Sequence, residues 1–276
     1  MKTGFLITAR LKSSRLPLKV MKDLNGKTVV ERVIERAKAI KGISEIVLCT
    51  SGNPQDRPLV DAALREGIYY FNGAPDDVLK RLLDAAKLFG LDYFLGITAD
   101  NPLITIRYSD LIVDELTKGR RDFIKLEGLP LGAATYGMRV KALETVCKVK
   151  TVVDTEIWGC LVDRPEIFDV KVIRAAGKLN RPELRFTLDY EKDYELINNI
   201  YSNVPCGTVL DLHDVIDYLD NNPGVARINR NCIQLKLAED VREKIDRNYR
   251  ENLSEIQRIR DEVYSSPQGS YSCGTP

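Results

Sequence analysis

Residues 4–19 of the chain are GFLITARLKSSRLPLK. The first five are apolar enough for a buried strand, and the polar, basic run after them cannot continue that strand because of its charge and Pro17. Residues 28–31 (TVVE) have the form of a capping box, which predicts a helix that runs to about Ile40. The order of strand, loop and helix is typical of an open α/β sheet.

The same alternation recurs along the next sixty residues. Apolar runs and turn residues predict strands at 45–50, 68–71 and 93–97, with helices at 58–66 and 77–89 between them. This period predicts a mixed, mostly parallel sheet with helices on both faces, and the strand at 68–71 is expected to be buried.

After Asp100 the rhythm loosens, as expected for a mixed second half. We expect helices at 108–117, 141–148, 154–161, 191–201 and 211–221, and strands at 122–126, 134–140, 168–173 and 185–188. Residues 237–264 are highly charged with a narrow apolar stripe, which predicts a peripheral helix or a partner-facing arm. The expected division is a main α/β domain at 1–232, a helical extension at 233–265 and a disordered tail at 266–276.

The composition excludes several classes of protein. The 276 residues include one histidine, His213, and six cysteines without any C-x-x-C pair, so zinc sites, disulfide frameworks and imidazole catalysis are not expected. No run reaches the roughly 18 apolar residues of a membrane-spanning helix, and no signal peptide is apparent. We therefore expect a cytoplasmic protein that does not bind membranes.

Basic residues gather at the start of the chain. The first 42 residues hold 11 Lys and Arg against 3 Asp and Glu, although the formal net charge of the whole chain is only +1. These residues include a single aromatic, Phe5, whereas nucleic-acid binders interleave cations with stacking side chains. A small anionic ligand is therefore expected rather than nucleic acid.

The loop after the first strand carries Arg10, Arg15 and Lys19. In open α/β sheets, ligands bind outside the carboxyl ends of strands, where fixed cations can neutralise a triphosphate of about four negative charges. Ser13 and Ser14 could donate hydrogen bonds to phosphate oxygens. The alternative is an ordinary solvated basic loop.

Two aspartates follow apolar stretches. Asp100 comes after the strand at 93–97, and Asp189 comes after the expected strand at 185–188. Mg²⁺ prefers one or two carboxylates together with phosphate oxygens and water, so these residues form a candidate metal pair. The alternative at each position is a turn or helix-cap aspartate.

Several spaced motifs are similar to those of the cytidylyltransferases that make CMP-activated sugars. They are residues 7–19 (ITARLKSSRLPLK), 25–27 (NGK), 73–81 (GAPDDVLKR), 98–104 (TADNPLI) and 188–195 (LDYEKDYE). The chain resembles above all the branch of spore coat polysaccharide biosynthesis proteins, and more distantly the CMP-Kdo and CMP-sialate synthetases. The resemblance covers about residues 4–230.

The resemblance implies a fold like that of nucleotide-diphospho-sugar transferases, CTP as donor, Mg²⁺ as cofactor, an acidic small-molecule acceptor and a homodimer. It implies catalytic roles for Arg10, Lys19 and Asp100, metal ligation by Asp100 and Asp189, and an acceptor contact at Glu156. The implied nucleotide-binding residues are Ala9, Arg10, Lys12, Ser13, Ser14, Arg15, Lys19, Thr50, Ser51, Asp77 and Arg81.

One departure leaves alternatives open. Family members usually carry glycine after the loop proline, where this chain has Leu18, and leucine does not easily adopt a positive φ. A non-catalytic nucleotide-binding scaffold is therefore one alternative. The pair of carboxylates beside the basic loop argues against it, because a scaffold has no need of them. A glycosyltransferase of the same fold is another, but its Asp-x-Asp signature is replaced here by residues 100–102 (DNP). An RNA-binding role is the weakest alternative.

Overall fold

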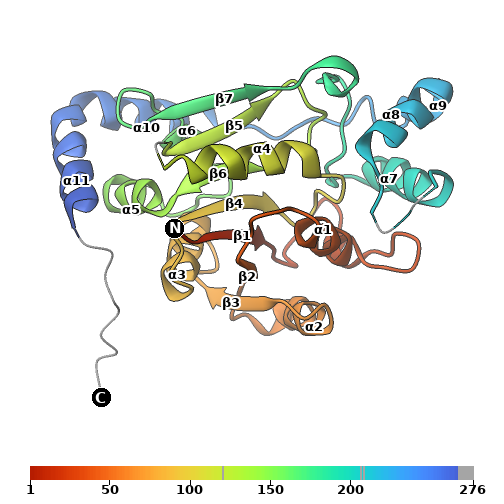
Figure 1. Ribbon diagram of the computed structural model, residues 1–276, viewed down its shortest axis with the longest axis horizontal. Coiled ribbons are helices and arrows are strands. Elements are labelled where there is room, and N and C mark those ends of the chain that lie inside the picture. The colour runs from red at the N-terminus through yellow and green to blue at the C-terminus, as the bar shows by residue number, and fades with distance from the viewer. Residues whose placement is uncertain (120, 206, 208, 267–276) are drawn as a thin grey trace.

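The computed structural model describes residues 1–119, 121–205, 207 and 209–266. Seven strands within these residues form one sheet of order β3-β2-β1-β4-β6-β5-β7, with helices on both faces (Figure 1), so the predicted fold class is confirmed. Strands β1 to β4 pair in parallel, β7 pairs in parallel with β5, and β6 runs antiparallel to both neighbours. The strands are β1 (Thr3–Thr8), β2 (Glu45–Ser51), β3 (Tyr69–Gly73), β4 (Tyr93–Thr98), β5 (Phe123–Glu127), β6 (Tyr136–Arg139) and β7 (Val170–Arg174).

Alternate residues of β1 enter two separate cores. Phe5 and Ile7 pack under the helices of one face, and Leu6 packs under those of the other, because successive side chains of a strand point to opposite sides. The first face carries α1 (Val29–Lys38), α2 (Arg57–Arg65) and α4 (Ile106–Thr117). The second carries α3 (Val78–Leu88), α5 (Val140–Val149), α6 (Gly159–Val162), α10 (Glu239–Glu251) and α11 (Leu253–Ser265).

A third core lies beyond the carboxyl ends of the parallel strands. Helices α7 (Glu191–Asn203), α8 (Leu212–Asn221) and α9 (Pro223–Ala226) pack there against Leu16, Leu24 and Leu103, to the right in Figure 1. Since β1 to β4 are parallel, the loops that follow them meet at this same edge. The edge is therefore where the basic loop and Asp100 come together with the segment before α7.

Helix α1 begins as predicted. The Thr28 hydroxyl accepts a hydrogen bond from the Glu31 backbone N–H, and the Glu31 carboxylate accepts one from the Thr28 N–H at 2.8 Å, which completes the capping box. The apolar face of α1 is fully buried, with Val30, Val33 and Ile34 at its centre. Asp211 likewise caps α8, at the start of the helix expected at 211–221, by accepting from the His213 N–H.

Two predicted elements are wrong. Residues 185–188 make only an isolated bridge between Arg185 and Leu131, and the Leu188 N–H donates to the Asp100 carbonyl instead of to a strand partner. The helix expected at 154–161 shortens to α6, because Thr155 is pinned to the start of α3 by hydrogen bonds with the Leu79 N–H and Asp77. In both cases a contact distant in sequence overrides the local pattern.

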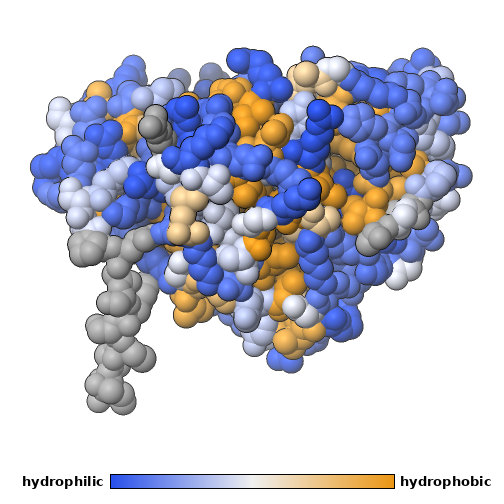
Figure 2. Space-filling view, viewed as in Figure 1, coloured by the Kyte–Doolittle hydropathy of each residue, from blue (hydrophilic) through white to orange (hydrophobic). Residues whose placement is uncertain are grey.

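The strand expected to be buried at 68–71 is an edge strand. Tyr69 and Tyr70 keep 54% and 41% of their surfaces exposed, because β3 has a neighbour on one side only. Part of the other end of the sheet is also uncovered on one side. In the view of Figure 1, no helix lies in front of β5 and β7, and Figure 2 shows hydrophobic residues among hydrophilic ones at that place, above α4.

The long helix expected at 237–264 breaks at Asn252 into α10 and α11. Its apolar stripe faces the chain's own second core, where Ile245 and Ile256 are buried, so the two helices form a peripheral pair packed on this chain. The Lys141 side chain of α5 donates to the Tyr264 carbonyl at 2.8 Å, which holds the end of α11 in place. The buried stripe therefore gives no support to the expected homodimer, which stays a prediction. Except for Ser266, the expected tail at 266–276 lies outside the described residues.

Candidate active site

The basic loop is anchored where it leaves β1. The Leu11 N–H donates to Asp56 Oδ1 at 2.7 Å, and the Ser51 hydroxyl donates to the other oxygen of the same carboxylate. Asp56 is fully buried at the start of α2. Sequence reasoning missed this residue, since nothing in its local pattern distinguishes it from an ordinary helix-start aspartate. Ser51, one of the implied nucleotide-binding residues, therefore supports the loop in this structure.

Lys19 lies between the two predicted metal ligands. Its ammonium group donates to Asp100 Oδ2 and, at 2.9 Å, to Asp189 Oδ1. The side chains of Lys19 and Asp189 are 14% and 8% exposed. The carboxylates come from positions 89 residues apart, one after β4 and one before α7, yet a single cation reaches both. The structure thus brings the predicted pair together.

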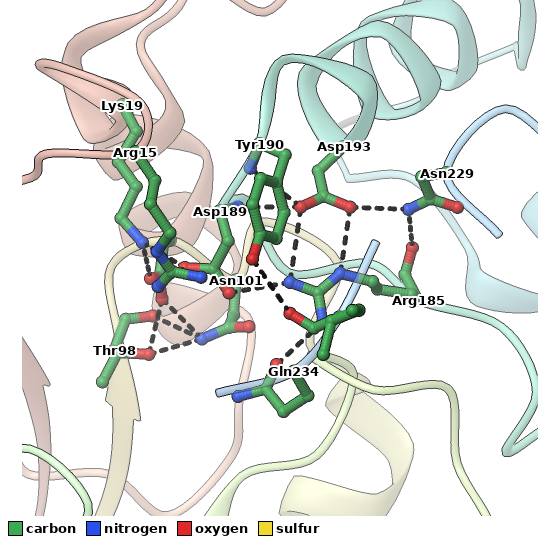
Figure 3. Close-up of polar contacts among 12 residues, drawn as sticks. Arg15, Lys19, Thr98, Asn101, Arg185, Asp189, Tyr190, Asp193, Asn229 and Gln234 are labelled. Carbon is green, nitrogen blue, oxygen red and sulfur yellow. Dashed lines mark hydrogen bonds and ion pairs between the residues drawn. The ribbon is translucent and has the colours of Figure 1, made fainter. Parts of the chain in front are cut away.

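Each of these carboxylates has one oxygen facing Lys19 and one held by the protein. Asp100 Oδ1 accepts from the Thr98 hydroxyl at 2.6 Å and from the Asn101 amide at 2.9 Å. Asp189 Oδ2 accepts from Arg185 Nη2 at 2.7 Å, while its Oδ1 also accepts from Arg15 Nη2 at 2.9 Å (Figure 3). Thr98 and Asn101 belong to the motif at residues 98–104 that the sequence analysis identified. The role of Arg185 in holding Asp189 was not predicted from the sequence.

Arg10 turns away from this group. One of its terminal nitrogens donates to Asp76 at 2.9 Å and to the Pro75 carbonyl, and the other donates to Glu156 at 2.8 Å. Glu156 is the residue that the resemblance implied on the acceptor side. The basic loop therefore divides between two clusters, with Arg15 and Lys19 at the carboxylate pair and Arg10 at Glu156.

The remaining predicted residues lie around these clusters. Asp77 caps α3 and accepts from Lys150, which indicates a structural part for its carboxylate. Arg81 is 1% exposed and donates to the Ala74 carbonyl at 2.6 Å. The Thr50 hydroxyl and Arg81 Nε have no hydrogen-bond partner among the residues that the structure describes. The other loop positions differ in exposure, with Ala9 buried, Ser13 half-buried, and Lys12 and Ser14 exposed.

Leu18 adopts the conformation that glycine would favour. Its φ and ψ are 52° and 27°, in the left-handed region, and 55% of its surface is exposed. The Met21 N–H donates to its carbonyl at 2.8 Å, which closes the short 3-10 turn of residues 19–21. Leucine therefore keeps the glycine-type turn at this position, at a cost in backbone strain.

Comparison with known proteins identifies the family of this chain. The sequence profile described as "Cytidylyltransferase" matches residues 5–164. The chain belongs to the cytidylyltransferase family. It is 31% identical over 241 residues to the uncharacterized protein MJ1063 of Methanocaldococcus jannaschii, covering 87% of this chain and 99% of that one. It is 23% identical to the spore coat polysaccharide biosynthesis protein SpsF of Bacillus subtilis, over 80% of this chain and 95% of that one.

A solved cytidylyltransferase from Leptospira borgpetersenii serovar Hardjo-bovis has the same architecture. The TM-score is 0.76 at 26% identity, with 86% of this chain and all of the other covered. The family profile ends before Arg185 and Asp189, so that half of the carboxylate pair lies outside the matched segment. Among the described residues of this cytidylyltransferase, no helix is long and apolar enough to cross a membrane.

Opposite charges set the protonation states at the centre of this cytidylyltransferase. Burial lowers the pKa of Lys19, but attraction by Asp100 and then Asp189 outweighs it and leaves the pKa above its usual value. Burial raises the pKa of Asp189, but Lys19, Arg15 and Arg185 outweigh it and leave the pKa below its usual value. The ammonium and the Asp189 carboxylate are therefore both charged at neutral pH.

The donor set of the pair fits Mg²⁺. Two carboxylate oxygens, Asp100 Oδ2 and Asp189 Oδ1, converge on one point, which Lys19 reaches from the loop. No group of three or more His, Cys, Asp or Glu side chains gathers as a metal site within the described ranges. A cation bound by these two carboxylate oxygens would draw other ligands from phosphates and water, which is the usual arrangement for Mg²⁺.

Proposed function

We propose that this cytidylyltransferase transfers CMP from CTP to an acidic sugar or similar acidic small molecule and releases pyrophosphate, with Mg²⁺ as cofactor. The observation that carries the proposal is the convergence of Asp100 and Asp189 on Lys19, beside Arg15. Phosphoryl-type transfer depends on positioning and charge neutralisation more than on a histidine base, and this site supplies both cations and paired carboxylates.

Different residues of the site would bind the triphosphate and the metal ion. Arg15 and Lys19 extend from the loop after β1, so they can leave the carboxylates and neutralise phosphate oxygens when a triphosphate arrives. Asp100 and Asp189 would then hold Mg²⁺, which supplies charge neutralisation at the phosphates and orients them. Thr98, Asn101 and Arg185 keep the two carboxylates aimed at that point throughout.

The acceptor is proposed to bind on the Glu156 side of the loop. The pKa of Arg10 is raised because Asp76 and Glu156 together outweigh the effect of its burial, so its guanidinium stays charged. An acidic acceptor could take over the bond that Glu156 now makes with Arg10, because its carboxylate has the same charge and geometry. The motifs shared with synthetases of CMP-activated acidic sugars support this choice of acceptor.

Pyrophosphate release tests the reaction directly. We would supply Mg²⁺ with each of the four nucleoside triphosphates and a panel of acidic sugars and phosphonates. The expected result is release that requires CTP and one class of acceptor. Release with another triphosphate alone would contradict the proposed donor, and calorimetry without Mg²⁺-dependent CTP binding would contradict the site.

Replacing Asp100 tests the metal pair. Asp100→Ala is expected to lower turnover by about a hundredfold or more, since a preorganised charge at the reacting phosphates is lost. Asp84→Ala is a matched control, because Asp84 is a carboxylate of α3 paired with Lys80 at the surface. Unchanged turnover in Asp100→Ala would refute the assignment of this residue.

A further inference from the structure

The two oxygens of Asp189 have different surroundings. Oδ1 faces Lys19 and Arg15, both from the basic loop, whereas Oδ2 accepts from Arg185 Nη2 at 2.7 Å. Arg15 is about one third exposed, but the Arg185 side chain is only 8% exposed. The loop cations can therefore move away from Oδ1 more readily than Arg185 can leave Oδ2.

Arg185 is immobilised by its other nitrogens. Its Nε donates to Asp193 Oδ1 at 3.0 Å, and its Nη1 donates to the Gln234 side chain at 2.8 Å. Asp193 is fully buried and its Oδ2 also accepts from the Asp189 backbone N–H at 2.9 Å. Figure 3 shows the guanidinium enclosed by Asp189, Asp193 and Gln234. A guanidinium with all three nitrogens bonded keeps a fixed direction.

The segment between α9 and α10 braces this arrangement. Asn229 donates to Asp193 Oδ1 at 2.8 Å and to the Arg185 carbonyl at 2.9 Å. Further along, the Ile233 carbonyl accepts from the Tyr190 hydroxyl at 3.3 Å, next to the bond between Gln234 and Arg185. Residues 229–234 thus connect the α10 and α11 pair to the carboxylate that faces Lys19.

We infer that Arg185 is a specificity-determining residue that restricts Asp189 to one available oxygen and so makes the site select Mg²⁺ over Ca²⁺. The inference rests on the proposed function, which supplies the metal and the nucleotide. Ca²⁺ takes six to eight oxygens and readily binds both oxygens of a carboxylate, whereas Mg²⁺ is smaller and requires near-octahedral geometry. Asp100 has the same restriction, since Thr98 and Asn101 hold its Oδ1. Two carboxylates that each offer one oxygen suit the smaller ion.

Calorimetry on the full chain can test the selection without turnover. We would measure the Kd of α,β-methylene-CTP, which is not cleaved, once with saturating Mg²⁺ and once with saturating Ca²⁺. Wild type is expected to bind about tenfold more tightly with Mg²⁺. In Arg185→Gln the ratio of the Kd with Ca²⁺ to the Kd with Mg²⁺ is expected to fall toward one, because Asp189 Oδ2 becomes available to the larger ion. A loss of affinity from general loosening would instead weaken binding with both ions alike.

Two milder variants complete the test. Gln234→Ala removes only the brace on Arg185 and is expected to lower the ratio about twofold to threefold. Gln257→Ala is the matched control, since it removes one side-chain bond from α11 to the Glu166 carbonyl on the surface, and its ratio should equal that of wild type. If thermal melting shows that Arg185→Gln does not fold, Gln234→Ala decides the question.

Several results would overturn the inference. They are equal affinities with the two ions in wild type, an unchanged ratio in folded Arg185→Gln, and, where that variant does not fold, an unchanged ratio in Gln234→Ala. Wild type that binds the analogue with neither ion would refute the proposed function itself, and the inference with it.

Discussion

Leu18 is a single residue whose backbone strain bears on the loop of the site. A left-handed backbone costs an ordinary L-residue about 1–2 kcal/mol, and Leu18 adopts it with 55% of its surface exposed. The turn brings Lys19 to the carboxylates. The leucine at this position therefore adds backbone strain to the turn that precedes Lys19.

We expect Leu18→Gly to change the free energy of unfolding by less than about 1 kcal/mol. The relief of strain is offset by the greater freedom of glycine in the unfolded chain, worth about 0.4–1 kcal/mol. Leu18→Val should lower the free energy of unfolding by about 1–2 kcal/mol, because a β-branched residue fits the left-handed region poorly. Urea unfolding measures both, and equal stability of Leu18→Val and wild type would contradict the strain.

Helices α10 and α11 are highly charged but bury an apolar face in the second core. Ile245, Tyr249 and Ile256 are buried in this core, where α10 contacts α6 and α11 contacts α5. The Tyr249 hydroxyl donates to the Leu161 carbonyl at 2.8 Å, which satisfies its one polar group in the core. The pair is thus part of the second core, and through residues 229–234 it continues into the site.

Ile256→Ala is expected to lower the free energy of unfolding by about 2–5 kcal/mol, since it leaves a cavity between α11 and the core. Ile233→Ala makes the same chemical change at a side chain that is 72% exposed, and should cost less than about 0.5 kcal/mol. Denaturant unfolding of the two variants gives the comparison. Similar losses in both would mean that α11 does not pack as described.

Across the whole molecule, Lys19 ties three distant segments together. It joins the loop after β1 to Asp100 after β4 and to Asp189 before α7, at sequence separations of 81 and 170 residues. The pKa of Asp189 is lowered, so its contribution to stability is present above its unfolded value of about 3.9 and is lost as the pH falls through the folded value. The pKa of Lys19 is raised, so its contribution is present below about 10.4 and is lost as the pH rises through the folded value.

Lys19→Met should therefore be less stable than wild type near pH 7, and the difference should narrow as the pH falls below about 4. Urea unfolding between pH 3 and pH 8 measures this. Lys12→Met is the control, because the Lys12 side chain is 70% exposed and lies 4.0 Å from Asp76 at the surface. A constant difference between Lys19→Met and wild type at every pH would contradict the described ion pairs.

Local sequence patterns were enough to predict the fold class, most of the strands and helices, the capping box of α1, and the positions of the basic loop and Asp100, whereas Asp189 was placed after a strand that does not form. These features depend on periodicity and on neighbours a few residues apart, which a sequence displays directly. Parallel strands also place their carboxyl ends at one edge, so the meeting of Asp100 with the loop follows from the alternation of elements.

Contacts between distant residues decided the rest. Only the packed chain shows that Arg10 bonds to Glu156, that residues 151–158 are not helical, and that Tyr69 lies on an edge strand. It also shows that Arg185 holds one oxygen of Asp189 while Lys19 faces the other. The physical reason is that burial and hydrogen-bond partners are properties of the assembled molecule, and a carboxylate's free oxygen is the one that its surroundings leave unbound.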